Sequence, residues 1–565
     1  MPRPLKPTTS LDTIRKEAKR WLKDVREGDR DAQDRLSAAV KHSEQPSLRV
    51  VQHALAREYG FESWAALKRD RERQAPPLFA TREERINAFL EHACLHYGVN
   101  PRSGRWEPTG YADAPERWAY AASLLARNPE MAKNDIHTAV VAGDVEAVRW
   151  ILERDPAAAR YKGGIEAWEP LLRLGYNRLP WPDAAETGLR IAELLLAHGA
   201  DPNAGWGDED KWPFTVITGV IGEGEGPLAI HPPHPSGMPL AELLVTHGAQ
   251  AYDRQSLYNT SLHEDDVRWL DFMGRHSRPA NEWSEVTGLL LDRAIAENHM
   301  ERARWVLTHC DARAALQGES PLYRRAIVAG FTELASLLVA HGAVRVTLTS
   351  EESFCAASTR LDRPVLEEIL RENPLLARSP SALFVAAEHN RVEAATLLLD
   401  LGVSPDVRSH SNRRPLHVAA SAGASDVAAL LIARGAEIDP IETEYGSTPI
   451  GGADWHRRPE TLALLAQHSR AMFPLVHSGQ IARIRQLLVE DSSLAALVRE
   501  RDGLTLLMVL PEDEEPAMEL AELLLAHGAD PARRNADGLT VREVALRRGF
   551  QDLADLIAEF ERTRK

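Results

Sequence analysis

One phrase recurs along the chain and sets a repeat of about 33 residues. It is a leucine-rich run closed by a glycine, and its copies are IAELLLAHGADPNA at 191–204, LAELLVTHGAQ at 240–250, LASLLVAHGAV at 334–344, ATLLLDLGVSPD at 395–406, VAALLIARGAEID at 427–439 and LAELLLAHGAD at 520–530. These glycines lie 49, 94, 60, 33 and 93 residues apart, so each gap spans one, two or three units, with an insertion in the first. Units this short cannot bury an apolar face alone, so they must stack into an array.

Each unit carries signals for two helices, most clearly in RRPLHVAASAGASDVAALLIARGAEID at 413–439. Pro415 can begin the first helix, because an N–H at that position would have no helical partner. Gly423 permits a turn between the helices. Gly435 can end the second helix in the left-handed conformation that a side chain disfavours. The pattern therefore predicts one pair of antiparallel helices per unit.

These motifs resemble the ankyrin repeat family, whose TPLH-x-A-x-x-G and LL-x-x-GAD elements match PLHVAASAG, STPI at 447–450, SPLY at 320–323 and HGAD at 198–201 and 527–530. The resemblance implies an all-α ankyrin-repeat solenoid, built from paired antiparallel helices with hairpin loops. About thirteen copies start near residues 136, 169, 214, 256, 289, 319, 353, 381, 413, 447, 472, 504 and 539, and a degenerate copy spans about 86–130. Four copies lack the glycine of the usual turn and end instead in NPEMAK, DPAAAR, NPLLAR and DSSLAALV.

Residues 1–75 depart from the repeat. Ser10, Asp31 and Ser47 can cap three helices with apolar residues at three- and four-residue spacing, which predicts a small helical bundle ahead of the solenoid. This segment resembles the helical region that precedes ankyrin repeats in many bacterial proteins, which indicates a bacterial origin.

The rest of the chain divides into residues 76–134, a linker with a degenerate capping repeat, and residues 135–565, the array, which has an insertion at 202–237. The formal charge is −16 overall, but residues 1–75 hold 17 Lys/Arg against 12 Asp/Glu, so they contribute +5 and the remainder −21. An acidic array repels phosphate backbones, which argues against nucleic acid as a ligand. We expect the basic bundle to dock on the array and cover the end of a terminal repeat.

The sequence carries no export or membrane signal. Its N-terminus, MPRPLKPTTSLDTIRKEAKR, lacks the apolar core of a signal peptide, and no run of about 18 apolar residues occurs. Cys94, Cys310 and Cys355 are far apart without CxxC spacing, so we expect buried free thiols. These features predict a cytoplasmic protein that does not associate with membranes.

The insertion is the largest departure from the repeat, and tryptophans gather around it. Eight of the 13 tryptophans lie between residues 150 and 305, although ankyrin cores are built from Ala, Leu and Val. They could fill gaps between irregular repeats, or they could serve as exposed binding anchors. A Tyr-Asn pair also occurs at the same place in two successive first helices. The candidate binding residues are therefore Trp168, Tyr176, Asn177, Arg178, Trp206, Trp212, Tyr258 and Asn259.

The same region holds residue types suited to acid–base chemistry. If the protein is an enzyme, the candidates are Glu223, Glu225, His231, His234, Tyr258 and His263. Their spacing does not favour catalysis, because the two glutamates flank a glycine and the histidines of HPPHP lie on an extended proline-rich segment. The HxxH spacing alone, without a helix or a CxxC partner, does not indicate a metal site. We therefore expect no metal and no cofactor.

These features favour a protein–protein recognition scaffold without chemistry. The partner would bind the concave face and finger loops of the array, and the acidic charge favours a partner with a basic surface. The alternative is an enzyme or small-molecule binder with a pocket built in the irregular repeats at about 168–266.

Overall fold

The computed structural model describes residues 3, 5, 9–39, 46–74, 81–107, 113–208, 212–225, 230–262, 264–317 and 321–563. The chain divides into two compact units, each with its own apolar core. Unit 1 comprises Met1–Ala75, Val328–Gly330 and Leu348–Lys565, and unit 2 comprises Pro76–Ile327 and Phe331–Thr347. Both ends of the chain therefore belong to unit 1.

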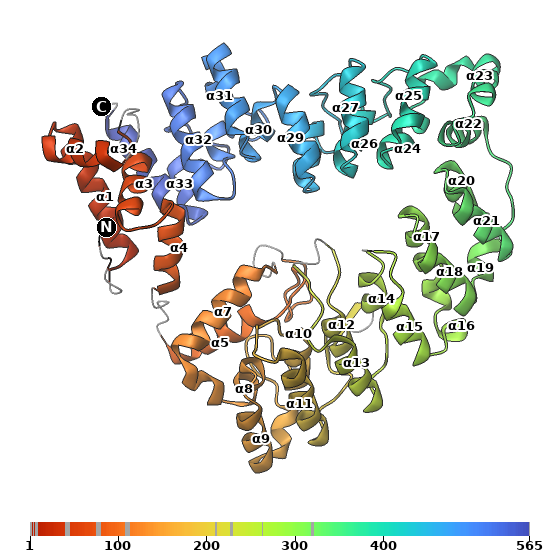
Figure 1. Cartoon of the computed structure of the whole chain (residues 1–565), viewed down its shortest axis with the longest axis horizontal. Helices are drawn as coiled ribbons and strands as arrows, with labels where there is room; N and C mark the ends of the chain where they lie inside the picture. The colour runs from red at the N-terminus through yellow and green to blue at the C-terminus, as the bar shows by residue number, and fades with distance from the viewer. Residues whose placement is uncertain are drawn as a thin grey trace. The chain divides into compact units, whose positions relative to one another are not determined.

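Stacked pairs of antiparallel helices form both units (Figure 1). In unit 2, α5 (Arg82–Ala93) and α7 (Pro115–Arg127) precede α8 (Ile136–Ala142) with α9 (Val145–Arg154), α10 (Pro170–Tyr176) with α11 (Ala184–Ala197), α12 (Val216–Ile221) with α13 (Gly237–Thr246), α14 (Arg254–Asn259) with α15 (Arg268–Arg275), and α17 (Ser284–Ala296) with α18 (Met300–His309). The short α16 (Pro279–Glu282) and α19 (Arg313–Gln317) lie between pairs, and α20 (Pro321–Val328) precedes α21 (Thr332–Ala340).

Unit 1 continues the array with α22 (Ser350–Thr359) and α23 (Arg363–Glu372), α24 (Ser381–Glu388) and α25 (Val392–Asp400), α26 (Pro415–Ala422) and α27 (Ser425–Ala433), α28 (Pro449–Trp455) and α29 (Pro459–His468), and α30 (Met472–His477) and α31 (Ile481–Glu490). A single 3-10 turn, η5 (Leu506–Met508), stands in for the first helix before α32 (Glu514–Ala526), and α33 (Val541–Arg547) with α34 (Gln551–Thr563) ends the array. The predicted all-α array of paired helices is thus confirmed.

The ends of the second helices explain the two kinds of closing phrase. Gly435, which follows α27, has φ 83°, the left-handed conformation predicted for it, and Gly423, in the predicted turn between the helices of that pair, has φ 81°. The copies without this glycine instead end in one turn of 3-10 helix: η1 (Pro129–Lys133), η2 (Pro156–Arg160), η3 (Pro374–Arg378) and η4 (Ser492–Ala496). The tighter 3-10 turn redirects the chain without a left-handed residue.

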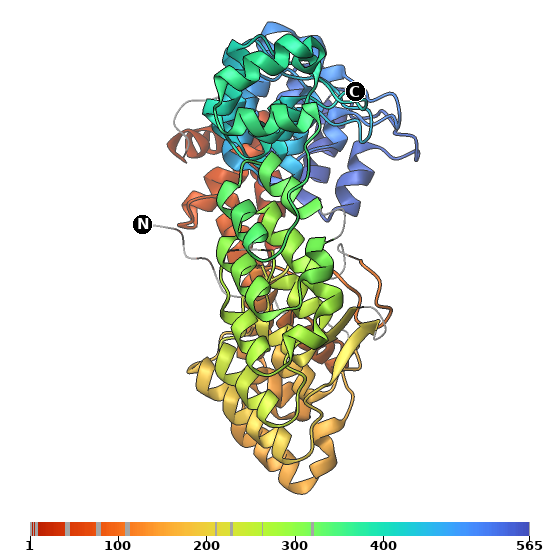
Figure 2. The ribbon, with the colours of Figure 1, turned by 90° about the vertical axis from the view of Figure 1, so that its right-hand side faces the viewer.

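The insertion begins with a two-stranded antiparallel hairpin, β1 (Gly205–Asp208) and β2 (Trp212–Thr215), which lies at the edge of the stacked helices of unit 2 (Figure 2). Trp206 pairs with Phe214 across the strands, and their rings stack at 4.3 Å. The hairpin leads directly into α12, whose N-cap Thr215 accepts a hydrogen bond from the Thr218 N–H. The remaining insertion, residues 222–236, runs between α12 and α13.

The N-terminal helices α1 (Leu11–Arg26), α2 (Arg30–Ala39), α3 (Leu48–Glu58) and α4 (Trp64–Gln74) pack against the last helices of unit 1 and share their apolar core (Figure 1). Ion pairs cross this interface from Arg15 to Asp552 at 2.8 Å, from Lys19 to Asp555 at 2.6 Å, and from Arg49 to Glu519 at 3.2 Å and Glu522 at 3.1 Å. The basic N-terminal segment therefore docks on acidic helices at the C-terminal end of the array, as its charge predicted. Among the described helices, none is long and apolar enough to cross a membrane.

Two glycines in first helices of unit 2 should respond oppositely to substitution. A Cβ on Gly219 in α12 would lie 2.4 Å from the Tyr176 ring, whereas one on Gly288 in α17 would meet its nearest neighbour at 4.0 Å. We expect Gly219→Ala to destabilise unit 2 by about 1–2 kcal/mol, because overpacking exceeds the gain in helix propensity. Gly288→Ala should instead stabilise it by about 0.5–1 kcal/mol. Urea unfolding followed by tryptophan fluorescence measures both changes, and equal shifts in the two variants would contradict this packing argument.

Candidate recognition site

Arg178 fixes the inserted loop to the interior of unit 2. Its guanidinium donates from Nε to the Pro232 carbonyl at 2.8 Å, from Nη2 to the Gly219 carbonyl at 2.6 Å, and from Nη1 to the Gly175 carbonyl at 3.0 Å. The side chain is buried, and burial lowers its pKa to about 10. The guanidinium therefore holds three backbone segments together through its hydrogen bonds and does not face solvent.

The two Tyr-Asn pairs lie at the ends of α10 and α14, and α12 lies between these helices, so the prediction that the pairs occupy successive first helices was wrong. Both pairs have an anchoring role. Asn177 Nδ2 donates to the Val141 carbonyl at 3.1 Å, and the Tyr176 hydroxyl donates to the Thr215 carbonyl at 3.0 Å. In the second pair, Asn259 Nδ2 donates to the Gly222 carbonyl at 3.2 Å, and the Tyr258 hydroxyl donates to Glu225 Oε1 at 2.7 Å. The pairs that the sequence suggested as pocket-lining groups thus tie the hairpin and the inserted loop to the helices.

The tryptophans singled out in the sequence lie in an aromatic cluster in the core of unit 2. Trp168 and Trp206 are 2% and 5% exposed, and their rings lie 5.5 Å apart. Tyr176 is fully buried between them, with its ring 5.2 Å from Trp168 and 5.9 Å from Trp206. The side chain of Trp212 and all of His263 lie outside the described residues. Trp168, Tyr176 and Trp206 therefore fill space around an irregular insertion and present no surface to a partner.

The acid–base candidates occupy different environments. Glu223 is buried with a left-handed φ of 55°, and burial raises the pKa of its carboxyl to about 7. His234 is buried, its pKa lies well below the usual value because of that burial, and its Nδ1 accepts the Ser236 N–H at 3.0 Å. His231 stacks on Tyr97 at 4.6 Å, and Glu225 is exposed.

Glu223 lines a cavity of about 30 Å³ with Thr260, Glu264, Asp266, Arg268, Trp269 and Arg302. Such a volume has room for one water molecule but not for a substrate. Among the described candidates, Glu223 is the one that reaches this cavity. Across the described residues, no group of three His, Cys, Asp or Glu side chains could hold a metal ion. The described acid–base candidates are therefore not gathered around this cavity.

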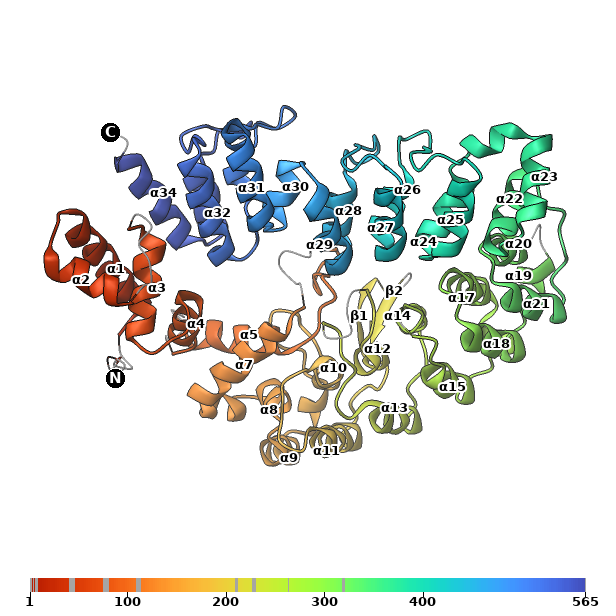
Figure 3. The same cartoon turned by 45° about the horizontal axis from the view of Figure 1, so that its top comes forward.

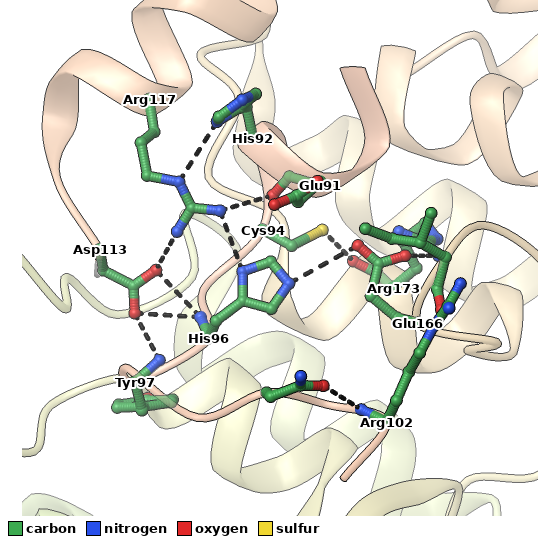
Figure 4. Close-up of polar contacts among 12 residues, drawn as sticks. Glu91, His92, Cys94, His96, Tyr97, Arg102, Asp113, Arg117, Glu166 and Arg173 are labelled. Atoms are coloured by element: carbon green, nitrogen blue, oxygen red, sulfur yellow. Dashed lines mark hydrogen bonds and ion pairs between the residues drawn. The ribbon is translucent and has the colours of Figure 1, made fainter. Parts of the chain in front are cut away.

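A buried polar cluster that the sequence did not reveal joins the degenerate repeat to the array (Figure 4). Asp113 accepts hydrogen bonds from the backbone N–H groups of His96 at 2.9 Å and Tyr97 at 2.6 Å, and it pairs with Arg117 Nη1 at 3.1 Å. Arg117 Nη2 also donates to the Glu91 carbonyl at 2.9 Å. Asp113 and Arg117 are spaced i, i+4 near the start of α7, but no repeat motif marks that stretch of the sequence.

A second ion pair lies on the other side of His96. Glu166 Oε2 accepts from Arg173 Nη2 at 2.9 Å, and His96 Nε2 lies 3.6 Å from Glu166 Oε1 (Figure 4). The three side chains are fully buried. Burial alone would raise the pKa of Glu166, but the charge of Arg173 and the proximity of His96 outweigh it and lower that pKa to about 2. The pair therefore stays ionised and acts as an internal support of unit 2.

Unit 1 exposes several large apolar side chains around α28. Ile441 and Tyr445, in the loop before α28, are 58% and 77% exposed, and Trp455 at the end of α28 is 84% exposed. Figure 3 shows α28 beside α26 and α29 in the stack. Exposed tyrosine, tryptophan and arginine are the residue types enriched at the centres of protein interfaces. We refer to Arg413, Ile441, Tyr445, Trp455, Arg457 and Arg501 together as the finger surface; Arg457 is exposed two residues after Trp455.

Arg501 reaches the finger surface because one finger loop is missing. Only residues 469–471 join α29 to α30, so the next hairpin after 441–447 is the one closed by the Val498–Thr505 bridge. Arg501 lies at the tip of this hairpin, and a Cβ on Gly446 would be 3.6 Å from its Nη1. The loop that carries Tyr445 therefore has a guanidinium beside it.

Comparison with known proteins identifies part of this array. Residues 353–442, from α22 to the loop before α28, match the family model for ankyrin repeats in three copies. A chain in the complex of a predatory endopeptidase with its immunity protein from Bdellovibrio bacteriovorus aligns at 18% identity over 32% of this chain and 98% of that one, with a TM-score of 0.27. Structural overlap at that level carries no argument about function.

Several curated proteins share sequence with the chain. Serine/threonine-protein kinase 12 of Arabidopsis thaliana is 31% identical over 18% of this chain and 22% of its own length. The E3 ubiquitin-protein ligase KEG of Arabidopsis thaliana is 25% identical over 64% of this chain and 23% of its own length. The B-cell lymphoma 3 protein homolog of Mus musculus is 29% identical over 18% of this chain and 24% of its own length. The chain thus spans about a quarter of the length of these three relatives.

Proposed function

Taking this chain as an ankyrin-repeat protein, we propose that it is a protein-recognition scaffold and that its partner binds the finger surface of unit 1. The observation that carries the proposal is the exposure of Trp455 and Tyr445, at 84% and 77%, next to the repeats that match the family model. Exposed tryptophan and tyrosine side chains are favoured anchors at the centres of protein interfaces.

The location follows from a contrast between the tryptophans near the insertion and the exposed residues around α28. Trp168 and Trp206, near the insertion, are within the core of unit 2 and cannot contact a partner without unfolding it. Ile441, Tyr445 and Trp455 are open to solvent and lie on a finger loop and the end of a first helix, elements that rigid neighbours support. A partner that covers them would bury apolar area at about 25 cal/mol per Å². We therefore assign recognition to unit 1.

The proposal is tested by photo-crosslinking with a benzoylphenylalanine residue at position 445 or, as a matched control, at position 150. Trp150 is 55% exposed on α9 of unit 2, and Arg154 covers its ring at 4.0 Å. We expect a protein to be captured from the native lysate at 445 and not at 150. Alanine at Tyr445 or Trp455 should weaken binding of that protein at least tenfold, about 1.4 kcal/mol each. Equal capture at both positions, or no loss in either alanine variant, would overturn the assignment.

A further inference from the structure

We propose that the finger surface takes an acidic segment of its partner, with carboxylates at the arginines and an apolar side chain against Tyr445 and Trp455. This inference rests on the proposed function and adds the chemistry of the ligand. It runs against the net charge of −16, which would favour a basic partner. Charges more than about 8 Å away are largely screened at physiological salt, so the local arginines determine what binds here.

Arg413 lies next to the loop that carries Tyr445, because Asn412 Nδ2 donates to the Ile441 carbonyl at 2.7 Å and the Thr443 N–H donates to the Ser411 carbonyl at 2.8 Å. Burial together with the charges of Arg458 and Arg413 lowers the pKa of His456, the residue after Trp455. A hydrogen bond to Glu444 raises the pKa of Tyr445, and the charge of Arg413 opposes that rise. One exposed guanidinium is therefore close enough to act on both ends of the surface, while His456 stays neutral near pH 7.

Arg501 adds a second guanidinium beside the loop that carries Tyr445. Its side chain is 64% exposed, and it shares Asp502 with Arg499, which holds that carboxylate more closely at 2.8 Å against 3.5 Å. Arg413 and Arg457 have no carboxylate within ion-pair distance among the described residues. The arginines of this surface therefore keep hydrogen-bonding capacity for a ligand, and planar guanidinium groups bind carboxylates through two parallel hydrogen bonds.

The carboxylates near the surface are largely committed to other groups. Asp454 lies 2.7 Å from His477 Nδ1. Glu442 is buried, and its oxygens accept the backbone N–H groups of Glu444 at 2.8 Å, Tyr445 at 2.9 Å and Ser447 at 3.1 Å. Glu444 is exposed beside Tyr445 and is the nearest carboxylate with free access to a ligand. Three arginines, at 413, 457 and 501, therefore outweigh it.

The test is fluorescence anisotropy of the full chain with a labelled peptide of about twelve residues, rich in Asp and Glu and containing two leucines. We expect saturable binding that weakens as NaCl is raised, and no binding of the same peptide with lysine in place of each acid. The double variant Arg413→Glu/Arg501→Glu should bind at least tenfold more weakly. Arg371→Glu, an exposed charge reversal on α23 of the same unit, should bind like the unmodified chain. Circular dichroism checks that each variant is folded.

The outcomes separate this inference from the proposed function. If the acidic peptide fails to bind while crosslinking at 445 captures a protein, the inference falls and the scaffold stands. If single-stranded DNA or polyphosphate binds as tightly as the peptide with the same arginine dependence, the surface selects anions in general and the inference also falls. If both the peptide and the crosslinking fail, both proposals fall.

Discussion

Asp552→Ala is expected to lower the free energy of unfolding of unit 1 by about 3 kcal/mol, the lower end of the range for a broken buried ion pair. Asp552 is 1% exposed and accepts from Arg15 Nε at 2.8 Å, Arg15 Nη2 at 3.0 Å, Gln52 Nε2 at 3.1 Å and Trp64 Nε1 at 3.3 Å. Removing it leaves donors from three N-terminal helices without their acceptor. The cost stays at the lower end because the Arg15 side chain is 14% exposed and can recover some hydration.

Hydrogen exchange measured by mass spectrometry gives the size and place of this effect. Amides of α1, α3 and α34 should exchange faster together in Asp552→Ala, because the three helices share one core. Asp555→Ala is the matched control, since its partner Lys19 is 42% exposed, and it should cost about 0.5–1 kcal/mol. Unchanged exchange in α1 and α3 would show that the N-terminal helices do not depend on this contact.

The sequence predicts the repeat and its helix pairs because these depend on local signals. The role of Gly435 depends only on its own left-handed backbone conformation, and the role of Pro415 depends only on its position at the start of a helix. Each role can therefore be recognised from a few neighbouring residues in the sequence. The docking of the N-terminal helices followed from opposite net charge. Which groups meet could not be foreseen, because Arg15 and Asp552 are 537 residues apart and no motif links them.

Exposure is the property that residue type did not encode. Trp168 and Trp455 are the same residue in the same array, yet one is 2% and the other 84% exposed. Trp168 is buried because the hairpin at 205–215 and the chain around His96 fold over it, and those contacts are non-local. Trp455 is the last residue of α28 and is left open to solvent there. The sequence therefore indicated the candidate binding residues near the insertion by composition alone. The exposure of the finger surface could be recognised only from the folded structure.

The second large effect is expected in unit 2, where Glu166→Ala should lower the free energy of unfolding by about 3–5 kcal/mol. The substitution would leave the guanidinium of Arg173, which is fully buried, without its counter-ion. Replacing both partners, as in Glu166→Leu/Arg173→Met, should cost much less, because no charge then stays buried. Urea unfolding read by tryptophan fluorescence reports on this unit, since ten of the 13 tryptophans belong to it. Equal losses in the single and double variants would contradict the argument.

The same pair should make unit 2 sensitive to acid in a defined window. Because the folded-state pKa of Glu166 is lowered to about 2 from its ordinary value of 4.5, its stabilisation is present in full above pH 4.5 and is lost as the pH falls towards 2. The free energy of unfolding of the unmodified chain should therefore fall more steeply between pH 4.5 and 2 than that of Glu166→Leu/Arg173→Met. The double variant keeps every other carboxylate, so the difference between the two slopes isolates this one group. Parallel slopes would mean that protonation of other carboxylates governs the acid unfolding of unit 2.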